Sequence, residues 1–87
     1  MASFLARVYV SLKPTVNDPQ GLTIADGLRS LGFGEVESVR AGKYLEVRLS
    51  AASAEEALSR VDTMCEKLLA NPIIENYRFD IEEIVAD

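Results

Sequence analysis

Apolar residues along this chain recur with two different periods. Over residues 4–12 they occupy every second position and include several β-branched side chains: Phe4, Ala6, Val8, Val10 and Leu12. Such an alternation predicts a half-buried β-strand. We expect the strand to end at Lys13 and Pro14, because proline has no N–H to donate to a neighbouring strand.

The next segment carries the signals of a helix. Asp18 is placed to cap its N-terminus, and Pro19 occupies the first helical position, where a missing N–H costs nothing. The apolar residues of this segment have helical spacing: Ile24, Leu28 and Leu31. They predict a core-facing stripe. Gly32 can adopt the left-handed conformation that ends many helices, so we expect the helix to stop there.

Alternation returns over residues 35–50 and predicts a second strand. It keeps its phase through Ala41 and Gly42, which favours one long strand bent at Gly42. The alternative is a hairpin at these two residues. We consider it the lesser option, because alanine would occupy a turn position that requires positive φ.

Residues 53–70 predict a second helix. Ser53 and Glu56 have the spacing of a capping box, in which each side chain accepts a hydrogen bond from a free backbone N–H. The expected apolar stripe of this helix has seven members: Ala54, Ala57, Leu58, Val61, Cys65, Leu68 and Leu69. Asn71 and Pro72 should stop the helix, because a residue before proline is disfavoured in helical geometry. Residues 73–81 then alternate as a third strand, and the acidic tail 82–87 is expected to fray.

These segments predict one α+β domain over residues 1–87, with the order β-α-β-α-β, or β-α-β-β-α-β if the middle strand is a hairpin. We expect a small, mainly antiparallel sheet with both helices on one face. The other face would carry Leu5, Tyr9 and Tyr44 in the company of three arginines: Arg7, Arg40 and Arg48. A patch of this composition predicts self-association, at least as a dimer.

Composition narrows the possible functions. The chain is 48% hydrophobic and 26% charged, as is usual for a globular protein, and its formal charge is −5. No positive charge is in excess to neutralise phosphates, so we expect no binding to nucleic acid. No apolar run approaches the roughly 20 residues that cross a bilayer, and the N-terminus lacks the pattern of a signal peptide. We therefore expect no membrane association and predict a cytoplasmic protein.

The reactive residues are few. Histidine is absent and Cys65 is the single cysteine, so the commonest general base and metal ligand are missing. Cys65 lies in an apolar stripe and is interpreted as a structural thiol. A phosphate site at the start of the first helix is conceivable, but Asp18 would repel the anion. We predict no catalytic, cofactor-binding or metal-binding residue in this chain.

Five stretches occur in an order that is informative as a set: VYVSLK at 8–13, DPQG at 18–21, LGF at 31–33, VRAGK at 39–43 and MCEKLLANPIIENY at 64–77. They resemble the PurS family, the small subunit of phosphoribosylformylglycinamidine synthase. The resemblance extends from about residue 8 to residue 81. DPQG and C-x-KLLANP are specific in combination, whereas each alone is weak.

The resemblance implies a PurS-like fold and a non-catalytic role in de novo purine biosynthesis. It implies a subunit that joins a glutaminase (PurQ) to a synthetase (PurL), so that ammonia from glutamine converts formylglycinamide ribonucleotide to formylglycinamidine ribonucleotide. ATP, magnesium and glutamine would be used by those partners, with no cofactor on this chain. The family motif positions are carried over as structural or interface residues: Asp18, Pro19, Gln20, Gly21, Arg40, Gly42, Lys43, Cys65, Leu68, Asn71, Pro72 and Tyr77.

Two other classes of function are open at this point. The first is a ferredoxin-like dimeric domain that senses a small molecule, held at glycine turns near the dimer interface. The second is an independent enzyme, which would need Glu46 or Glu75 as a general base without a visible partner. We rank the enzyme last.

Overall fold

The computed structural model describes residues 1–85 of the chain. Its elements are β1 (Ala2–Leu12), α1 (Pro19–Ser30), β2 (Gly42–Ala51), α2 (Ala54–Met64), the π-helical segment η1 (Cys65–Leu69) and β3 (Glu75–Ile84). The strands form one antiparallel sheet in the order β2-β1-β3. The α+β class and the order β-α-β-α-β are therefore confirmed.

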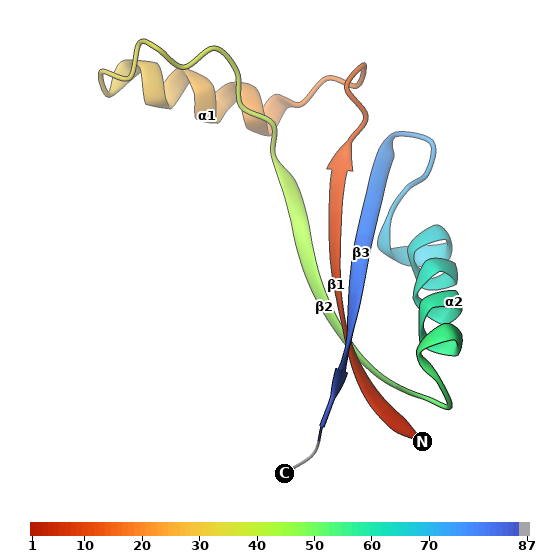
Figure 1. Cartoon of the computed structure of the whole chain (residues 1–87). Helices are drawn as coiled ribbons and strands as arrows, with labels where there is room; N and C mark the ends of the chain where they lie inside the picture. The colour runs from red at the N-terminus through yellow and green to blue at the C-terminus, as the bar shows by residue number, and fades with distance from the viewer. Residues whose placement is uncertain (86–87) are drawn as a thin grey trace.

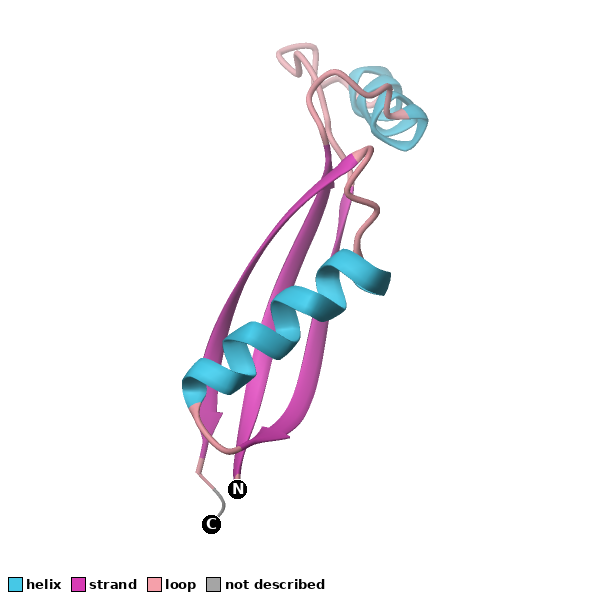
Figure 2. Cartoon of the chain, turned by 90° about the vertical axis from the view of Figure 1, so that its right-hand side faces the viewer, coloured by secondary structure: helices cyan, strands magenta, loops and turns pink. Residues whose placement is uncertain are grey.

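One face of the sheet packs under α2 (Figure 2). The central strand β1 contributes four fully buried side chains to this inner face: Phe4, Ala6, Val8 and Val10. Ala57, Val61 and Cys65 of α2 and η1 cover them, at the i, i+4 and i+8 positions of one helical face. The hydrophobic core is thus a single layer between one helix and one sheet.

The helix α1 lies elsewhere. It projects from the end of the sheet, past the β2 edge, and covers neither face (Figure 1). The expectation of two helices on one face is therefore wrong for α1. Its predicted core stripe is largely in solvent, with Ile24 41% and Leu31 76% exposed. Periodicity reveals that a helix has an apolar face, but it does not reveal which surface covers that face.

The second strand is shorter than expected, since residues 35–41 lie outside it and β2 begins at Gly42. There is neither a bend within a strand nor a hairpin at this point. Arg29 explains the difference, because its guanidinium donates to the carbonyls of Val36 (3.0 Å) and Glu37 (2.8 Å). These carbonyls are paired with α1 rather than with a neighbouring strand. Gly32 does adopt a positive φ of 104°, as predicted for the helix end.

Two further expectations are corrected near the C-terminus. Glu82, Glu83 and Ile84 do not fray but pair with β1, whereas Ala86 and Asp87 of the expected tail lie outside the described residues. In the second helix, Leu58 is 46% exposed and Leu68 is 83% exposed, although both belong to the predicted stripe. Leu68 lies in η1, where a wider π-helical turn changes the angle between successive side chains.

The shape is elongated for 87 residues. The radius of gyration is 17.0 Å, against about 12 Å for a compact domain of this length. The accessible surface is 6193 Å², against roughly 5,000 Å² for a folded monomer of this mass. The isolated chain therefore leaves on the order of 1,000 Å² more surface in water than a typical monomer does.

Two glycines of α1 provide a matched test of its attachment. A Cβ at Gly21 would lie 2.2 Å from the Val39 carbonyl oxygen, whereas a Cβ at Gly27 would meet nothing within 4 Å. We expect Gly21→Ala to destabilise the protein by about 1–3 kcal/mol, because backbone must move. Gly27→Ala should stabilise it by up to about 1 kcal/mol. Thermal unfolding followed by circular dichroism measures both, and equal effects of the two substitutions would contradict this account.

Candidate interaction surfaces

The described residues offer little for catalysis. Cys65 is fully buried, and burial raises the pKa of its thiol, with Asp62 and Glu66 adding to the effect. The thiol therefore stays protonated at neutral pH and is a poor nucleophile. Within residues 1–85 no group of three or more potential metal ligands comes together, and no helix is long and apolar enough to span a membrane. The functional features of this part of the chain are surfaces.

Asp18 connects α1 to the sheet. One carboxylate oxygen accepts a hydrogen bond from the Gly21 N–H at 2.9 Å, and the other accepts one from the Ala41 N–H at 2.6 Å. The side chain is buried, with 4% of the residue exposed. These two donors, Gly21 first, hold the pKa of Asp18 below its usual value. The carboxylate occupies the helix N-terminus that a phosphate would need, so the structure favours the cap over an anion site.

The other motif residues near Asp18 serve the same junction. The Arg40 guanidinium donates to the carbonyl oxygens of Lys13 at 3.0 Å and Val16 at 2.9 Å. It thereby joins the segment between α1 and β2 to the connection between β1 and α1. Arg40 was expected on the outer face of the sheet, and that placement is wrong. Gly42 begins β2 where a Cβ would lie 2.6 Å from the Val10 carbonyl oxygen, so close strand pairing requires glycine here.

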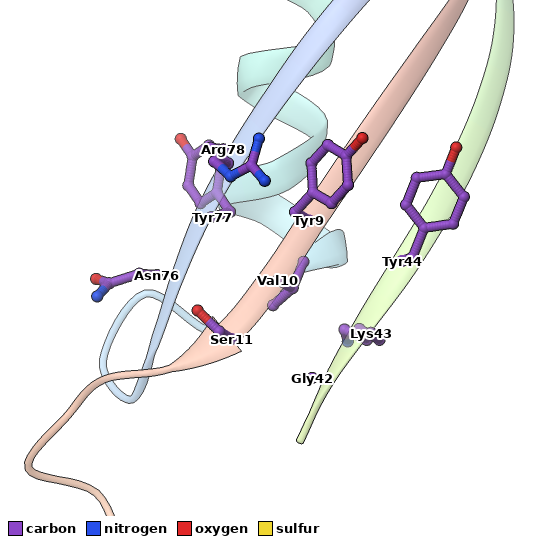
Figure 3. A pocket seen from close by; sticks show the side chains of 9 residues that line it. All are labelled: Tyr9, Val10, Ser11, Gly42, Lys43, Tyr44, Asn76, Tyr77 and Arg78. Carbon is purple, nitrogen blue, oxygen red and sulfur yellow. The ribbon is translucent and has the colours of Figure 1, made fainter. Parts of the chain in front are cut away.

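The outer face of the sheet, opposite α2, carries an aromatic cluster at its α1 end (Figure 3). The rings of Tyr9 and Tyr44 lie 5.2 Å apart, and the Arg78 guanidinium lies 4.0 Å above the Tyr9 ring. Tyr44 is 49% exposed. Lys43 and Asn76 line the same open hollow, which has a volume of about 500 Å³. An arginine stacked on a tyrosine, with a second tyrosine and a hollow beside it, is typical of protein contact sites.

Charged pairs occupy the middle of the outer face. Arg7 donates to Asp80 at 3.2 Å and to Glu82 at 3.0 Å, and its pKa is raised by these two acceptors, Glu82 first. Leu5 is half-buried and lies beyond Arg7, opposite Arg48 and Glu82 in the strand register. The structure therefore brings Tyr9 and Tyr44 together but leaves Leu5 apart from them. The role of these three residues in self-association stays a prediction.

The motif residues after η1 form a corner between η1 and β3. The Asn71 side chain accepts from the Ile73 N–H at 3.1 Å, and the Asn71 carbonyl accepts from the Glu75 N–H at 2.7 Å. The Tyr77 hydroxyl donates to Asp62 of α2 at 2.6 Å, which raises the pKa of Tyr77 to about 12. These contacts hold β3 against α2. Tyr77 also packs against the core of the inner face, and it lines the hollow beside the aromatic cluster.

Sequence patterns did not indicate a groove beside the edge strand β2. It has a volume of about 410 Å³ and lies between Val47 and the exposed sides of α2 and η1, including Met64 and Leu68. Arg60 and Lys67 also line it. The apolar side chain of Leu68 was the sequence feature that could have indicated this groove. Its helical spacing instead assigned Leu68 to the core.

A half-covered sheet, an outlying helix with an exposed apolar stripe, and an apolar groove define a small α+β domain with uncovered apolar surfaces. Comparison with known proteins agrees. Residues 5–83 match the family model "PurS: Phosphoribosylformylglycinamidine (FGAM) synthase". The chain belongs to the PurS family.

Individual relatives extend this result. The chain is 48% identical to a phosphoribosylformylglycinamidine synthase subunit PurS from Synechocystis over 91% of this chain and 79% of that protein. It is 46% identical to the PurS subunit of Bacillus subtilis over 95% of this chain and 98% of that protein.

Solved structures agree with the sequence comparison. The B. subtilis PurS structure matches 92% of this chain and 99% of its own, at 46% identity and a TM-score of 0.81. A chain of the PurLQS structure from Thermotoga maritima matches over 97% of this chain and 100% of its own length, at 33% identity and a TM-score of 0.82. The comparisons do not favour a small-molecule-sensing domain.

The Asp18 junction makes stability depend on pH. Because the folded pKa of Asp18 is lowered, its ionised form stabilises the fold above about pH 4, and this contribution is lost as the pH falls through the lowered pKa. We expect Asp18→Ala to lower the Tm at pH 7, and the gap from the unmodified chain to narrow in acid. Asp26→Ala is the control, since Asp26 lies on α1 with its side chain 80% exposed. A gap that stays constant with pH would contradict the proposed role of Asp18.

Proposed function

We propose that this chain is the non-catalytic subunit that joins the glutaminase and synthetase subunits, PurQ and PurL, of a phosphoribosylformylglycinamidine synthase. Ammonia released from glutamine would then be used on formylglycinamide ribonucleotide within one assembly. The observation that carries the proposal is the near-complete match to a chain of the T. maritima PurLQS structure, which spans 97% of this chain. The absence of histidine and the protonated, buried Cys65 are consistent with it.

The surfaces of the chain suit a joining role. Exposed apolar side chains lie at three separate places, just after α1 (Leu31), in η1 (Leu68) and at the corner before β3 (Ile73). A subunit with apolar contacts on separated sides can hold two larger chains at a fixed distance. Holding the site that makes ammonia close to the site that consumes it raises the effective concentration of ammonia, without any reactive group on the subunit itself.

The proposal extends to partners, cofactors and location. ATP, magnesium and glutamine would bind to the synthetase and glutaminase, with no cofactor on this chain. The protein would act in the cytoplasm, where purine synthesis takes place, and would self-associate as a dimer or tetramer. Leu5, Tyr9 and Tyr44 of the outer face, and the motif residues that remain exposed, such as Gln20 and Leu68, are candidates for these contacts.

Reconstitution from purified subunits tests the joining role. We expect omission of this chain to lower glutamine-dependent product formation by roughly tenfold or more, because the local supply of ammonia is lost. Synthesis driven by excess ammonium chloride should survive better, since it bypasses the joined assembly. Glutamine-dependent turnover that is unchanged without the chain would refute the proposal. Strong thermal stabilisation of the chain alone by one free metabolite would favour a sensor instead.

Self-association has a separate test. The excess exposed surface, which includes apolar side chains such as Leu31 and Leu68, predicts an oligomer, because monomers rarely leave such side chains in water together. Multi-angle light scattering at micromolar concentration should give at least twice the 9.5 kDa mass of one chain. A mass of 9.5 kDa would contradict this prediction.

A further inference from the structure

We propose that the hollow at the α1 end of the outer face binds an acidic segment of a partner subunit. A carboxylate of that segment bonds to the Arg78 guanidinium, and an apolar side chain beside it packs against Tyr9 and Tyr44. The inference rests on the proposed joining function and deepens it, because it assigns one surface, the residue that anchors the contact and the charge of the partner. It is carried by the position of Arg78, by the charges around the hollow, and by the open shape of the hollow.

Small and large side chains adjoin one another in this hollow. In the strand register Ser11 lies opposite Gly42 of β2, and two residues earlier Tyr9 lies opposite Tyr44. The small residues leave a depression of about 500 Å³ beside the two rings (Figure 3). A side chain that enters it meets ring faces on one side and the polar groups of the strands below. The depression therefore has room for one or two side chains of another protein.

Arg78 is held in place without being neutralised. Asp80 lies two residues further along the same face of β3, but it accepts a hydrogen bond from Arg7 at 3.2 Å. The Arg78 guanidinium lies instead 4.0 Å above the Tyr9 ring, and none of the ion pairs within residues 1–85 includes it. Stacking on a ring fixes the plane of a guanidinium and leaves the N–H donors at its edge for a carboxylate. Arg78 is therefore oriented before any partner arrives.

The charge of the hollow is opposite to that of the whole chain. The chain has a formal charge of −5, whereas two cations, Lys43 and Arg78, line the hollow and no carboxylate of residues 1–85 does. Glu46, two residues beyond Tyr44 on β2, accepts from the Tyr44 hydroxyl at 2.8 Å and thereby holds that ring. An acidic segment is attracted to this hollow and repelled by the acidic remainder of the chain. Charge therefore selects both the partner and the place where it binds.

A second copy of the chain is a poor occupant of this hollow. In a symmetric pair the same surface of each copy meets itself across the two-fold axis. Lys43 and Arg78 of one copy would then face the same two cations of the other copy, and like charges across an interface disfavour association. Leu5, which lies beyond Arg7 on the outer face, remains a candidate for self-association. Tyr9 and Tyr44 are assigned here to a different partner.

The shape of the hollow favours a protein segment over a small molecule. Sites for small molecules enclose most of the ligand surface in a cleft or cavity. This hollow is open on the outer face, because α2 packs on the opposite face and α1 projects past the sheet (Figures 1 and 2). Tyr44 is 49% exposed beside it. Tyrosine and arginine are the residues that contribute most to affinity in many protein interfaces, so the composition also indicates a protein partner.

Charge reversal at Arg78 tests the contact, with Arg48 as the matched control. Arg48 is exposed on the same outer face and belongs to none of the ion pairs within residues 1–85, but it lies outside the hollow, opposite Leu5. Binding of each variant to the purified synthetase and to the purified glutaminase is measured by biolayer interferometry. We expect Arg78→Glu to raise the Kd for one of the two subunits by roughly tenfold or more, and Arg48→Glu to change it by less than about twofold.

Two further measurements distinguish a charge-paired contact from a change in folding. Arg78→Lys keeps the charge but not the planar fork of donors, so its affinity should lie between those of the unmodified chain and Arg78→Glu. Raising the salt concentration from about 0.05 M to about 0.5 M should weaken binding of the unmodified chain more than binding of Arg78→Glu. Circular dichroism checks that each variant folds. Arg78→Gln, which removes the charge without reversing it, replaces Arg78→Glu if that variant is unfolded.

The outcomes separate this inference from the joining function. Equal effects of the Arg78 and Arg48 reversals overturn the inference alone. So does a fall to the mass of one chain in Arg78→Glu only, which assigns the hollow to a second copy. Thermal stabilisation by millimolar inorganic phosphate or ATP that is lost in Arg78→Glu also overturns it, because the hollow is then a small-anion site.

An unmodified chain that binds neither partner subunit overturns both proposals. Binding that depends on Arg78, combined with glutamine-dependent turnover that is unchanged when the chain is omitted, refutes the joining function and supports the acidic contact.

Discussion

The carboxylate of Asp18 is the contact on which the shape of the molecule depends. It bonds to the N–H groups of Gly21 and Ala41, so it caps α1 and fixes the segment that returns to β2 in the same place. Arg40 adds a second connection across the same junction, through the carbonyls of Lys13 and Val16. Neither hydrophobic cluster of the described residues includes a residue of α1, so these polar contacts fix the position of the helix relative to the sheet (Figure 1). The fold thus has an apolar part under α2 and a hydrogen-bonded part around Asp18.

This division has a consequence for function. A chain of 87 residues can bury only a modest core, and here much of its apolar surface is kept outside that core. Leu31, Leu68 and Ile73 remain in water in the isolated chain, in three different places. Such an arrangement is costly for a monomer but useful for a subunit that meets several neighbours. The proposed joining role would account for these exposed residues.

The sequence predicted the elements better than their arrangement. The strand pattern of β1, the caps at Asp18 and Ser53 and the stop at Gly32 were correct, because each depends on residues close together in the chain. The stripe on α1 was correctly seen as apolar, but it was wrongly assigned to the core. Residues 35–41 alternated like a strand, yet Arg29 bonds to their carbonyls. Among the candidate site residues, Arg40 was expected at an interface, but its guanidinium donates to the backbone carbonyls of Lys13 and Val16.

By itself, then, the sequence determined the class of the fold, the lack of histidine chemistry and the family, since these follow from local periodicity, composition and motifs. Tertiary structure alone decided that α1 extends beyond the sheet, that Leu68 leaves the core at a π-helical turn, and that β2 keeps a free edge beside an apolar groove. The physical reason is that periodicity records which residues avoid water, whereas the surface that covers them, on this chain or on another, is set by contacts between distant segments.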